Sequence, residues 1–264
     1  MIEAAIDLLS WGTIFLYLSA LLSNIPILSR NKPVCSFISL TLLWTGFSLH
    51  TSSILLRTYL VGHAPMANLY ETLTFFSWSI IFSNLIVILR YKERALERIT
   101  IPVAVIILFL AQQAVKKVGP LPAVLRTRWF EIHVMASFWA YALFVLAFAA
   151  AVLFLIEERK KTPNRLSTYQ DILSRGMVWG LALFSTSMFT GSIWAFLAWG
   201  NYWLWEPKTL WSFILWFYYS GAIHIAYVKE YRGKAGAIAS IFGLILVLIT
   251  YMGVSVLMKS SHTF

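Results

Sequence analysis

The chain has 264 residues, of which 59% are hydrophobic and only 12% are charged, and its mean hydropathy is +0.75. A soluble domain averages roughly 45–50% apolar and about 25% charged residues, so the composition excludes a soluble globular protein. It predicts an all-α, polytopic membrane protein. The formal charge of +10 needs no nucleic-acid partner, because basic residues gather in the inner loops of membrane proteins.

Eight segments are apolar enough to cross a bilayer, which takes about 20 helical residues. We therefore predict eight transmembrane helices within one integral-membrane domain, residues 1–264. The fourth segment is the weakest, because it is short and ends at Gln112 and Gln113. The predicted spans are 6–28, 34–56, 69–89, 99–114, 131–156, 177–198, 209–228 and 236–258.

The basic residues divide unevenly between the two sides that these spans define. The loops after spans one, three, five and seven hold 14 of the 21 Lys and Arg residues, and the other side holds 7. Because basic loops stay on the inner side, both termini and the segment between spans six and seven are expected outside.

Two further features bear on chemistry and processing. The N-terminal sequence MIEAAID has no basic region ahead of the first apolar run, so we expect no cleavable signal peptide. Cys35 is the single cysteine, which excludes an internal disulfide or a CxxC redox pair. Any thiol chemistry must therefore come from a partner or a substrate.

The segment 199–211 reads WGNYWLWEPKTLW and holds four tryptophans. Pro207 disfavours a continuous helix, so the segment connects two spans. Tryptophans often anchor helices at a membrane interface, but that explains one or two of them rather than four on a short connection. The cluster favours a platform for a flat, apolar, anionic ligand such as heme.

Two of the five histidines are expected at the level of the tryptophan segment. His133 begins span five and His262 follows span eight. Imidazole is a common ligand of heme iron, so these two rings could bind one heme from opposite faces. The simpler alternatives are an interfacial histidine bonded to a carbonyl at His133 and a disordered terminal residue at His262.

The other histidines lie elsewhere. His224 falls about 15 residues into span seven, roughly 22 Å from the outer surface, whereas His50 falls in the outer half of span two. Opposite ligands of one iron need nearly equal depth, so His224 needs a second ligand from another chain, unless it makes only a hydrogen bond between helices. For His50 we favour a structural role. For His63 we favour a structural or propionate-contacting role.

Together these residues resemble the CcsA/ResC-type cytochrome c biogenesis proteins of system II, a heme-handling membrane family named for its tryptophan-rich WWD loop. Residues 62–71, GHAPMANLYE, look like that family's GHxPxSNLYES segment. The family loop usually carries Asp-Pro-Lys-Glu-Thr-Trp, so Glu206 keeps the first acid and Thr209 replaces the second. The loop residues that match, or correspond, are Trp199, Gly200, Trp203, Trp205, Glu206, Pro207, Lys208 and Trp211.

The resemblance implies that heme b, a transient substrate, is delivered across the membrane and presented to apocytochrome c. The CxxCH thiols of that substrate would add to the heme vinyl groups. The implied iron ligands are His133 and His262 at an outer site and His224 at an inner one. A ResB/CcsB-type membrane protein is the implied partner, and any holocytochrome c synthase activity would require it.

Physical chemistry assigns roles within this site. Tryptophan faces bury the apolar heme, and Lys208, Arg126 or Arg128 could pair with its propionates. Glu206 would repel a propionate, so we expect it to anchor the loop through hydrogen bonds. The covalent step depends mainly on proximity, so no residue is assigned as general acid or base.

Two other interpretations stay open. The protein could be a heme-binding membrane anchor or electron-transfer subunit, or a non-catalytic assembly factor from a related branch with nitrite-reductase-linked proteins. In the last case the tryptophans are an interfacial belt. Heme that co-purifies with a bis-histidine spectrum favours biogenesis, and absence of heme even with the partner present favours the assembly factor.

The charge distribution yields a first testable prediction. Reporter fusions at Lys161 and at Lys208 should report opposite sides of the membrane, with Lys161 inside, because the more basic loops stay on the inner side. Activity of one reporter type at both positions would contradict the eight-span topology.

Overall fold

The computed structural model describes the chain except for residues 25–32, 65, 120, 161–164, 229–232 and 254–264. The described residues form helices and no strand, which confirms the all-α prediction. They divide into two compact units, residues 1–121 and residues 122–264. The expectation of a single domain stays a prediction.

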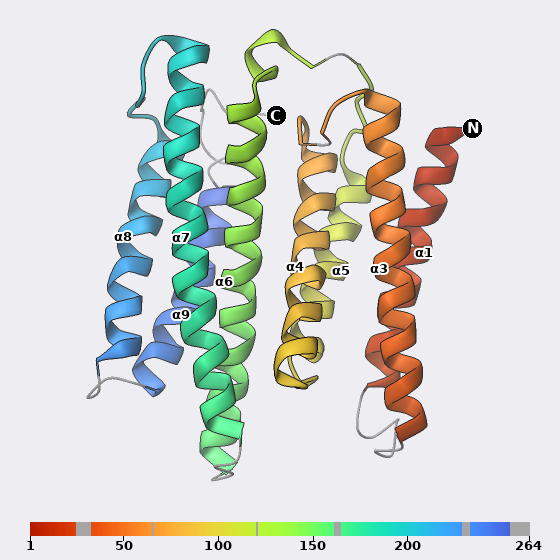
Figure 1. Ribbon diagram of the computed structural model, residues 1–264, viewed down its shortest axis with the longest axis vertical. Helices are drawn as coiled ribbons and strands as arrows, with labels where there is room; N and C mark the ends of the chain where they lie inside the picture. Colours follow the sequence, from red (N-terminus) through yellow and green to blue (C-terminus); the bar gives the residue numbers. More distant parts are fainter. Residues whose placement is uncertain (25–32, 65, 120, 161–164, 229–232, 254–264) are drawn as a thin grey trace. The chain divides into compact units, whose positions relative to one another are not determined.

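The first unit is a bundle of four helices in which α1 packs against α3 and α5, and α4 packs against α5 (Figure 1). Helix α4 begins where the side chain of Asn68 accepts a hydrogen bond from the backbone N–H of Glu71, and it ends at Lys92, which has a left-handed backbone. Such caps satisfy backbone groups that a helix leaves unpaired at its ends. The helices are α1 (Ile2–Ser23), α3 (Pro33–Val61), α4 (Leu69–Tyr91) and α5 (Glu97–Gln113).

The second unit is built on a long antiparallel pair, α6 and α7, against which α8 and α9 pack (Figure 1). Phe144 of α6 stacks on Tyr219 of α8, with ring centroids 3.6 Å apart. A Cβ at Gly180 or at Gly243 would clash with one of these rings, so small residues make room for the stack. The elements are η1 (Ala123–Leu125), α6 (Arg128–Lys160), α7 (Leu166–Trp199), α8 (Pro207–Tyr227), α9 (Lys234–Leu248) and a π-helical turn, Ile249–Gly253.

Each of the eight predicted spans overlaps one of these helices, and residues 25–28 of the first span and 254–258 of the eighth lie outside the described residues. Six are long and apolar enough to cross a membrane by length and composition. Helix α5, the weakest predicted span, has only 17 residues and is not among the six. Neither is α8, which is rich in Trp and Tyr. Helix α7 begins eleven residues before the predicted span, because the polar segment 166–176 continues it.

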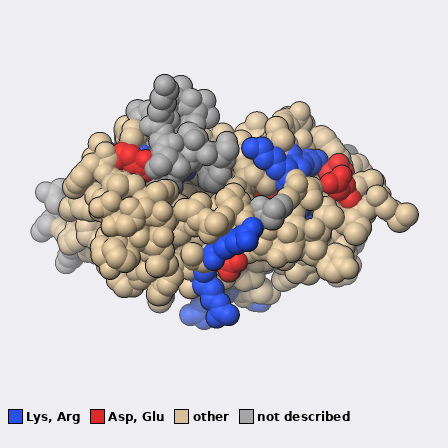
Figure 2. All heavy atoms as spheres, turned by 90° about the horizontal axis from the view of Figure 1, so that it is seen from above, with Lys and Arg blue, Asp and Glu red and all other residues tan. Residues whose placement is uncertain are grey.

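On the face that Figure 2 shows, Lys and Arg side chains of the described residues lie in more than one group, with Asp or Glu side chains near them. In the first unit, Arg94 donates to both carboxylate oxygens of Glu97, and Asn24 donates to the same carboxylate at 2.7 Å. This group joins the end of α1 to the start of α5. Arg94 therefore lies at helix ends, where basic residues of membrane proteins commonly gather.

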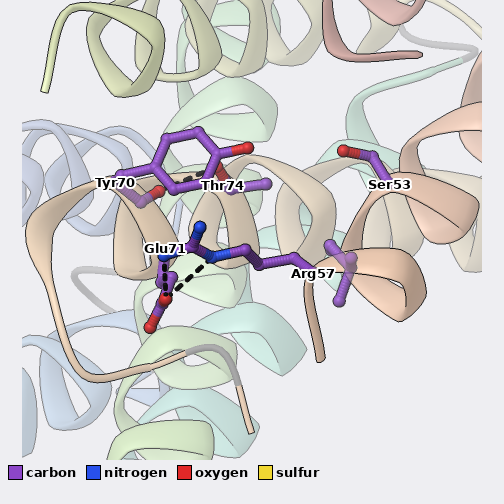
Figure 3. Close-up of a pocket in the computed structure, with 6 residues that line it drawn as sticks. Ser53, Arg57, Tyr70, Glu71 and Thr74 are labelled. Atoms are coloured by element: carbon purple, nitrogen blue, oxygen red, sulfur yellow. Dashed lines mark hydrogen bonds and ion pairs between the residues drawn. The ribbon is translucent and has the colours of Figure 1, made fainter. Parts of the chain in front are cut away.

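The opposite end of the first unit holds a buried ion pair. Arg57 of α3 donates from Nε and Nη2 to one oxygen of Glu71, at 3.0 and 2.8 Å, and the side chains are 4% and 1% exposed. The other oxygen of Glu71 accepts from the backbone of Ala67 at 2.9 Å. Figure 3 shows both side chains at a small cleft beside Tyr70, with the dashed contacts between them. Neither charge lacks a partner, as burial requires.

The ion pair yields a prediction about stability. Glu71→Gln should lower the free energy of unfolding by about 3–5 kcal/mol, because it leaves the Arg57 charge buried without its counter-charge. Asp171→Asn is the matched control: it removes the carboxylate from the exposed pair of Asp171 with Arg175, which should contribute about 0–1 kcal/mol. Thermal unfolding in detergent measures both, and equal shifts would contradict the assignment.

Candidate functional site

The tryptophan loop is the short connection between α7 and α8. Helix α7 ends at Gly200, whose φ of 74° lies in the left-handed region that glycine tolerates, and whose N–H bonds the carbonyl of Phe196 at 2.9 Å. Helix α8 begins with Pro207 at its first position, where the missing N–H costs no hydrogen bond. The predicted break between two spans is confirmed.

Glu206 and Thr209 together form a capping box that starts α8. The Glu206 side chain accepts from the backbone N–H of Thr209, and the Thr209 hydroxyl accepts from the backbone N–H of Glu206 at 3.2 Å. Threonine therefore replaces the acid of the family pattern without loss of the cap. This is the loop-anchoring role that the sequence predicts for Glu206.

His133 lies against α7 close to the start of the loop. Its Nδ1 is 2.8 Å from the backbone carbonyl oxygen of Ser187. Its ring lies parallel to Trp194, with centroids 6.0 Å apart, and Trp194 meets Trp199 edge to face at 4.9 Å. The Trp194 indole donates to the carbonyl of Val124, just before α6, at 2.8 Å. The imidazole is thus joined to the loop through one buried tryptophan.

A second aromatic group continues from the loop onto α8. Trp203 and Trp205 meet each other and Phe213 edge to face, with centroids 5.4 to 6.5 Å apart. Trp205 is 77% exposed. The Nε1 of Trp203 is buried and has no hydrogen-bond partner among the described residues. An aromatic surface with an unsatisfied N–H suits a flat ligand that carries acceptor groups.

Cationic side chains lie on the segments that flank this surface. Arg126 and Arg128 are exposed where η1 passes into α6, and Lys208 is half-buried in the first turn of α8. Val124 of η1 accepts from Trp194, and Thr209 in the first turn of α8 accepts from the backbone N–H of Glu206. Trp211, one turn further along α8, is half-buried, and its carbonyl accepts from Thr250 at 3.4 Å. These cations are placed to attract an anionic edge of a ligand.

His224 stands apart from this outer group. It occupies the last turn of α8, 17 residues after Pro207 and so roughly 25 Å along the helix. Its side chain is exposed, and Nδ1 lies 2.6 Å from the carbonyl oxygen of Ser220 in its own helix. The separation of His133 and His224 to opposite ends of the second unit agrees with the sequence prediction.

The remaining histidines have structural contacts or lie outside the described chain. His50 is fully buried in the first unit, with Nδ1 3.3 Å from the Tyr17 hydroxyl. His63 bonds the carbonyl of the next residue, Ala64, at 2.9 Å. His262 lies outside the described residues, so its role as an outer ligand stays a prediction. Within the described part of the chain, no group of three or more His, Cys, Asp or Glu side chains could hold a metal ion.

Three residues of this site were missed by the sequence reasoning: Ser187, Gly191 and Trp194. All three lie on the face of α7 that His133 contacts. Trp194 falls five residues before the tryptophan segment, so its nearness was a usable signal. Ser187 and Gly191 give no such signal, because their role depends on how α6 and α7 are aligned.

Comparison with known proteins agrees with this organisation. The family model described as cytochrome C assembly protein matches residues 66–262. The cytochrome c biogenesis protein CcsA of Prochlorococcus marinus subsp. pastoris is 29% identical, over 92% of this chain and 89% of that protein. CcsA of Pyropia yezoensis is 27% identical, over 79% of this chain and 81% of that protein.

Two larger proteins match in part. Protein NrfI of Wolinella succinogenes is 30% identical over 84% of this chain, but the match covers 25% of NrfI. The solved structure of cytochrome c heme lyase CcmF superposes on all of this chain with a TM-score of 0.77 and 14% identity. The chain spans 48% of the length of that structure. This likeness shows a shared fold.

The loop geometry yields a prediction about its tryptophans. Trp203→Ala and Trp205→Ala should each weaken retention of heme by about 10- to 150-fold, because burial of an aromatic side chain under the ligand contributes roughly 1.5–3 kcal/mol. Absorbance of the reduced protein measures heme per chain. Trp179→Ala is the control, since Trp179 is an exposed tryptophan elsewhere on α7. Unchanged heme content in both loop variants would make these residues interfacial anchors only.

Proposed function

The chain belongs to the cytochrome c assembly protein family, and on that premise we propose that it delivers heme across a membrane and presents it to apocytochrome c. The observation that carries the proposal is the junction of His133 with the tryptophan loop through Trp194. It places an imidazole, the common protein ligand of heme iron, beside a surface of aromatic rings.

The chemistry of the donor set fits heme. The apolar faces of Trp203 and Trp205 match the apolar macrocycle, and each square ångström they cover contributes about 25 cal/mol. The unsatisfied N–H of Trp203 and the cations Lys208, Arg126 and Arg128 suit the two propionates. Gly200 and the Glu206–Thr209 cap hold the loop between its two helices, so the aromatic surface is fixed in advance.

Iron ligation at the outer site is proposed for His133 and His262 together. A pair of imidazoles would fix the heme plane and leave the vinyl groups toward the substrate. Each cysteine S–H of the CxxCH segment then adds across one vinyl C=C: a C–S bond forms, and the thiol proton ends on the neighbouring vinyl carbon. The addition needs no external oxidant. The chain has one cysteine, so the substrate supplies both thiols.

A second heme position is proposed at His224. The side chain is exposed on α8, which suits an iron ligand whose opposite partner comes from another chain. The partner we propose is a ResB/CcsB-type membrane protein, and holocytochrome c synthase activity would arise only in that complex. Heme would reach His224 first, from the inner side, and then the outer site.

The membrane placement follows from the same scheme. We propose that the chain acts as one domain in the bacterial cytoplasmic membrane, or the thylakoid membrane of a plastid, with the tryptophan loop and both termini on the outer side. The 14 to 7 distribution of basic residues supports this orientation. Apocytochrome c would then meet heme outside.

The directional scheme predicts different results at the two sites. His224→Ala should deplete heme at both positions, because the outer position is filled from the inner one. His133→Ala should leave heme at the membrane position but stop maturation of cytochrome c, and His262→Ala should do the same if His262 is the second outer ligand. Heme spectra of the complex and heme-stained cytochrome c measure the two effects.

Added imidazole is the control for these variants. It should partly restore maturation in His133→Ala and His262→Ala by taking the vacant ligand position, whereas it cannot restore a loss of folding. Full occupancy of the outer heme site in His224→Ala would contradict the directional scheme. Normal cytochrome maturation in His262→Ala would remove that residue from the outer site.

A further inference from the structure

The imidazole of His133 lies directly against the backbone of α7. A Cβ atom built at Gly191 would stand 2.5 Å from Nδ1 and 2.8 Å from Cε1 of the ring. Both distances are too short for any real Cβ, and the conflicting atoms belong to a ring rather than to a flexible chain end. The ring can therefore occupy this position only because residue 191 is glycine.

The missing side chain also explains the hydrogen bond that the ring makes. In a helix each side chain leans toward the N-terminus and covers the preceding turn. Residue 191 is one turn after Ser187, so a side chain there would cover the carbonyl of Ser187. Glycine leaves that carbonyl open, and His133 Nδ1 reaches it at 2.8 Å.

The position of the proton on the ring follows from this contact. A carbonyl oxygen carries no proton, so a 2.8 Å contact is attractive only if Nδ1 is the donor. The nearby hydroxyls agree with this assignment. Ser137 Oγ uses its proton to donate to the carbonyl of His133 at 2.9 Å. Ser187 Oγ, which is 2.5 Å from Ser137 Oγ, must then donate its own proton to Ser137 Oγ. Ser187 Oγ, 3.0 Å from Nδ1, is then left to accept from the ring.

We infer that Gly191 and Ser187 are positioning residues, which fix His133 as the Nδ1–H tautomer, so that Nε2 is the ring nitrogen that carries the lone pair. The inference rests on the proposed function for the role of His133 as an iron ligand. The second nitrogen of a metal-binding imidazole is commonly held in this way by a carbonyl, which sets the ring orientation and raises its basicity. Here the carbonyl belongs to a neighbouring helix.

The test begins with the heme-free protein. Nitrogen NMR of full-length protein labelled at histidine, with the His133 signal assigned by subtraction of a His133→Gln spectrum, should show the proton on Nδ1. Gly191→Ala should move the ring and produce a mixture of tautomers. Ser187→Ala keeps the carbonyl and should change the tautomer less. Thr186→Ala is the matched control, since that exposed hydroxyl donates to the carbonyl of Ala182 in its own helix at 3.0 Å.

Heme binding gives the second measurement. Gly191→Ala should retain roughly 10- to 100-fold less heme at the outer site, the usual effect of removing an outer contact of a metal ligand, and added imidazole should restore part of it. A wild-type protein with the proton on Nε2 would overturn the inference even if Gly191→Ala failed to fold. Normal heme retention in Gly191→Ala, with loss in His133→Ala, would also overturn it and leave the proposed function intact. Normal retention of heme at the outer site in His133→Ala would instead overturn the proposed function.

Discussion

Close backbone contact between α6 and α7 is the interaction on which the second unit depends. Lipid gives helices little hydrophobic reason to associate, so packing must come from surfaces that approach closely. Gly176 lies against Ala147 and the carbonyl of Leu143, Gly180 lies against Phe144, and Gly191 lies against His133. The absence of a side chain at these glycines lets the two helices approach each other. At Gly191 it also leaves the carbonyl of Ser187 open to the imidazole of His133. Stability and the geometry of the site therefore have one source.

The first unit is stabilised in part by charged side chains that pair with one another. Arg57 and Glu71 satisfy each other, and the backbone of Ala67 completes the carboxylate. Lys116 pairs with Asp7 and, like Arg57, lies over the ring of Tyr70. The described residues of the segment 62–71, which resembles a family motif, thus include the start of α4 and the carboxylate of its ion pair, and His63 Nδ1 contacts the carbonyl of Ala64. Glu71 thus bonds the loop before α4 through the backbone N–H of Ala67.

Hydropathy predicted the eight helices because a lipid-facing residue must be apolar whatever its neighbours are. It did not predict that α7 starts at Leu166, because the segment 166–176 is polar and hydropathy detects only apolar helices. The break at Pro207 and the hydrogen-bonding role of Glu206 could be predicted because they depend on a few adjacent residues. The tryptophans appeared as one cluster in sequence. In space they form two groups, because Gly200 turns the chain between Trp199 and Trp203. Ser187 and Gly191 could not be found, because their function comes from the register of α7 on α6.

His133 and His224, the two proposed iron ligands among the described residues, differ in the contact that orients the ring. The difference agrees with the role proposed for each. Nδ1 of His224 contacts the carbonyl of Ser220 in its own helix, so its orientation depends on α8 alone. Nδ1 of His133 contacts a carbonyl of another helix, so its orientation depends on tertiary packing. Where the opposite iron ligand comes from a separate chain, the imidazole must be oriented before that chain binds. A contact within its own helix permits this. A ligand that holds heme during covalent attachment must resist displacement, and two helices constrain a ring more firmly than one.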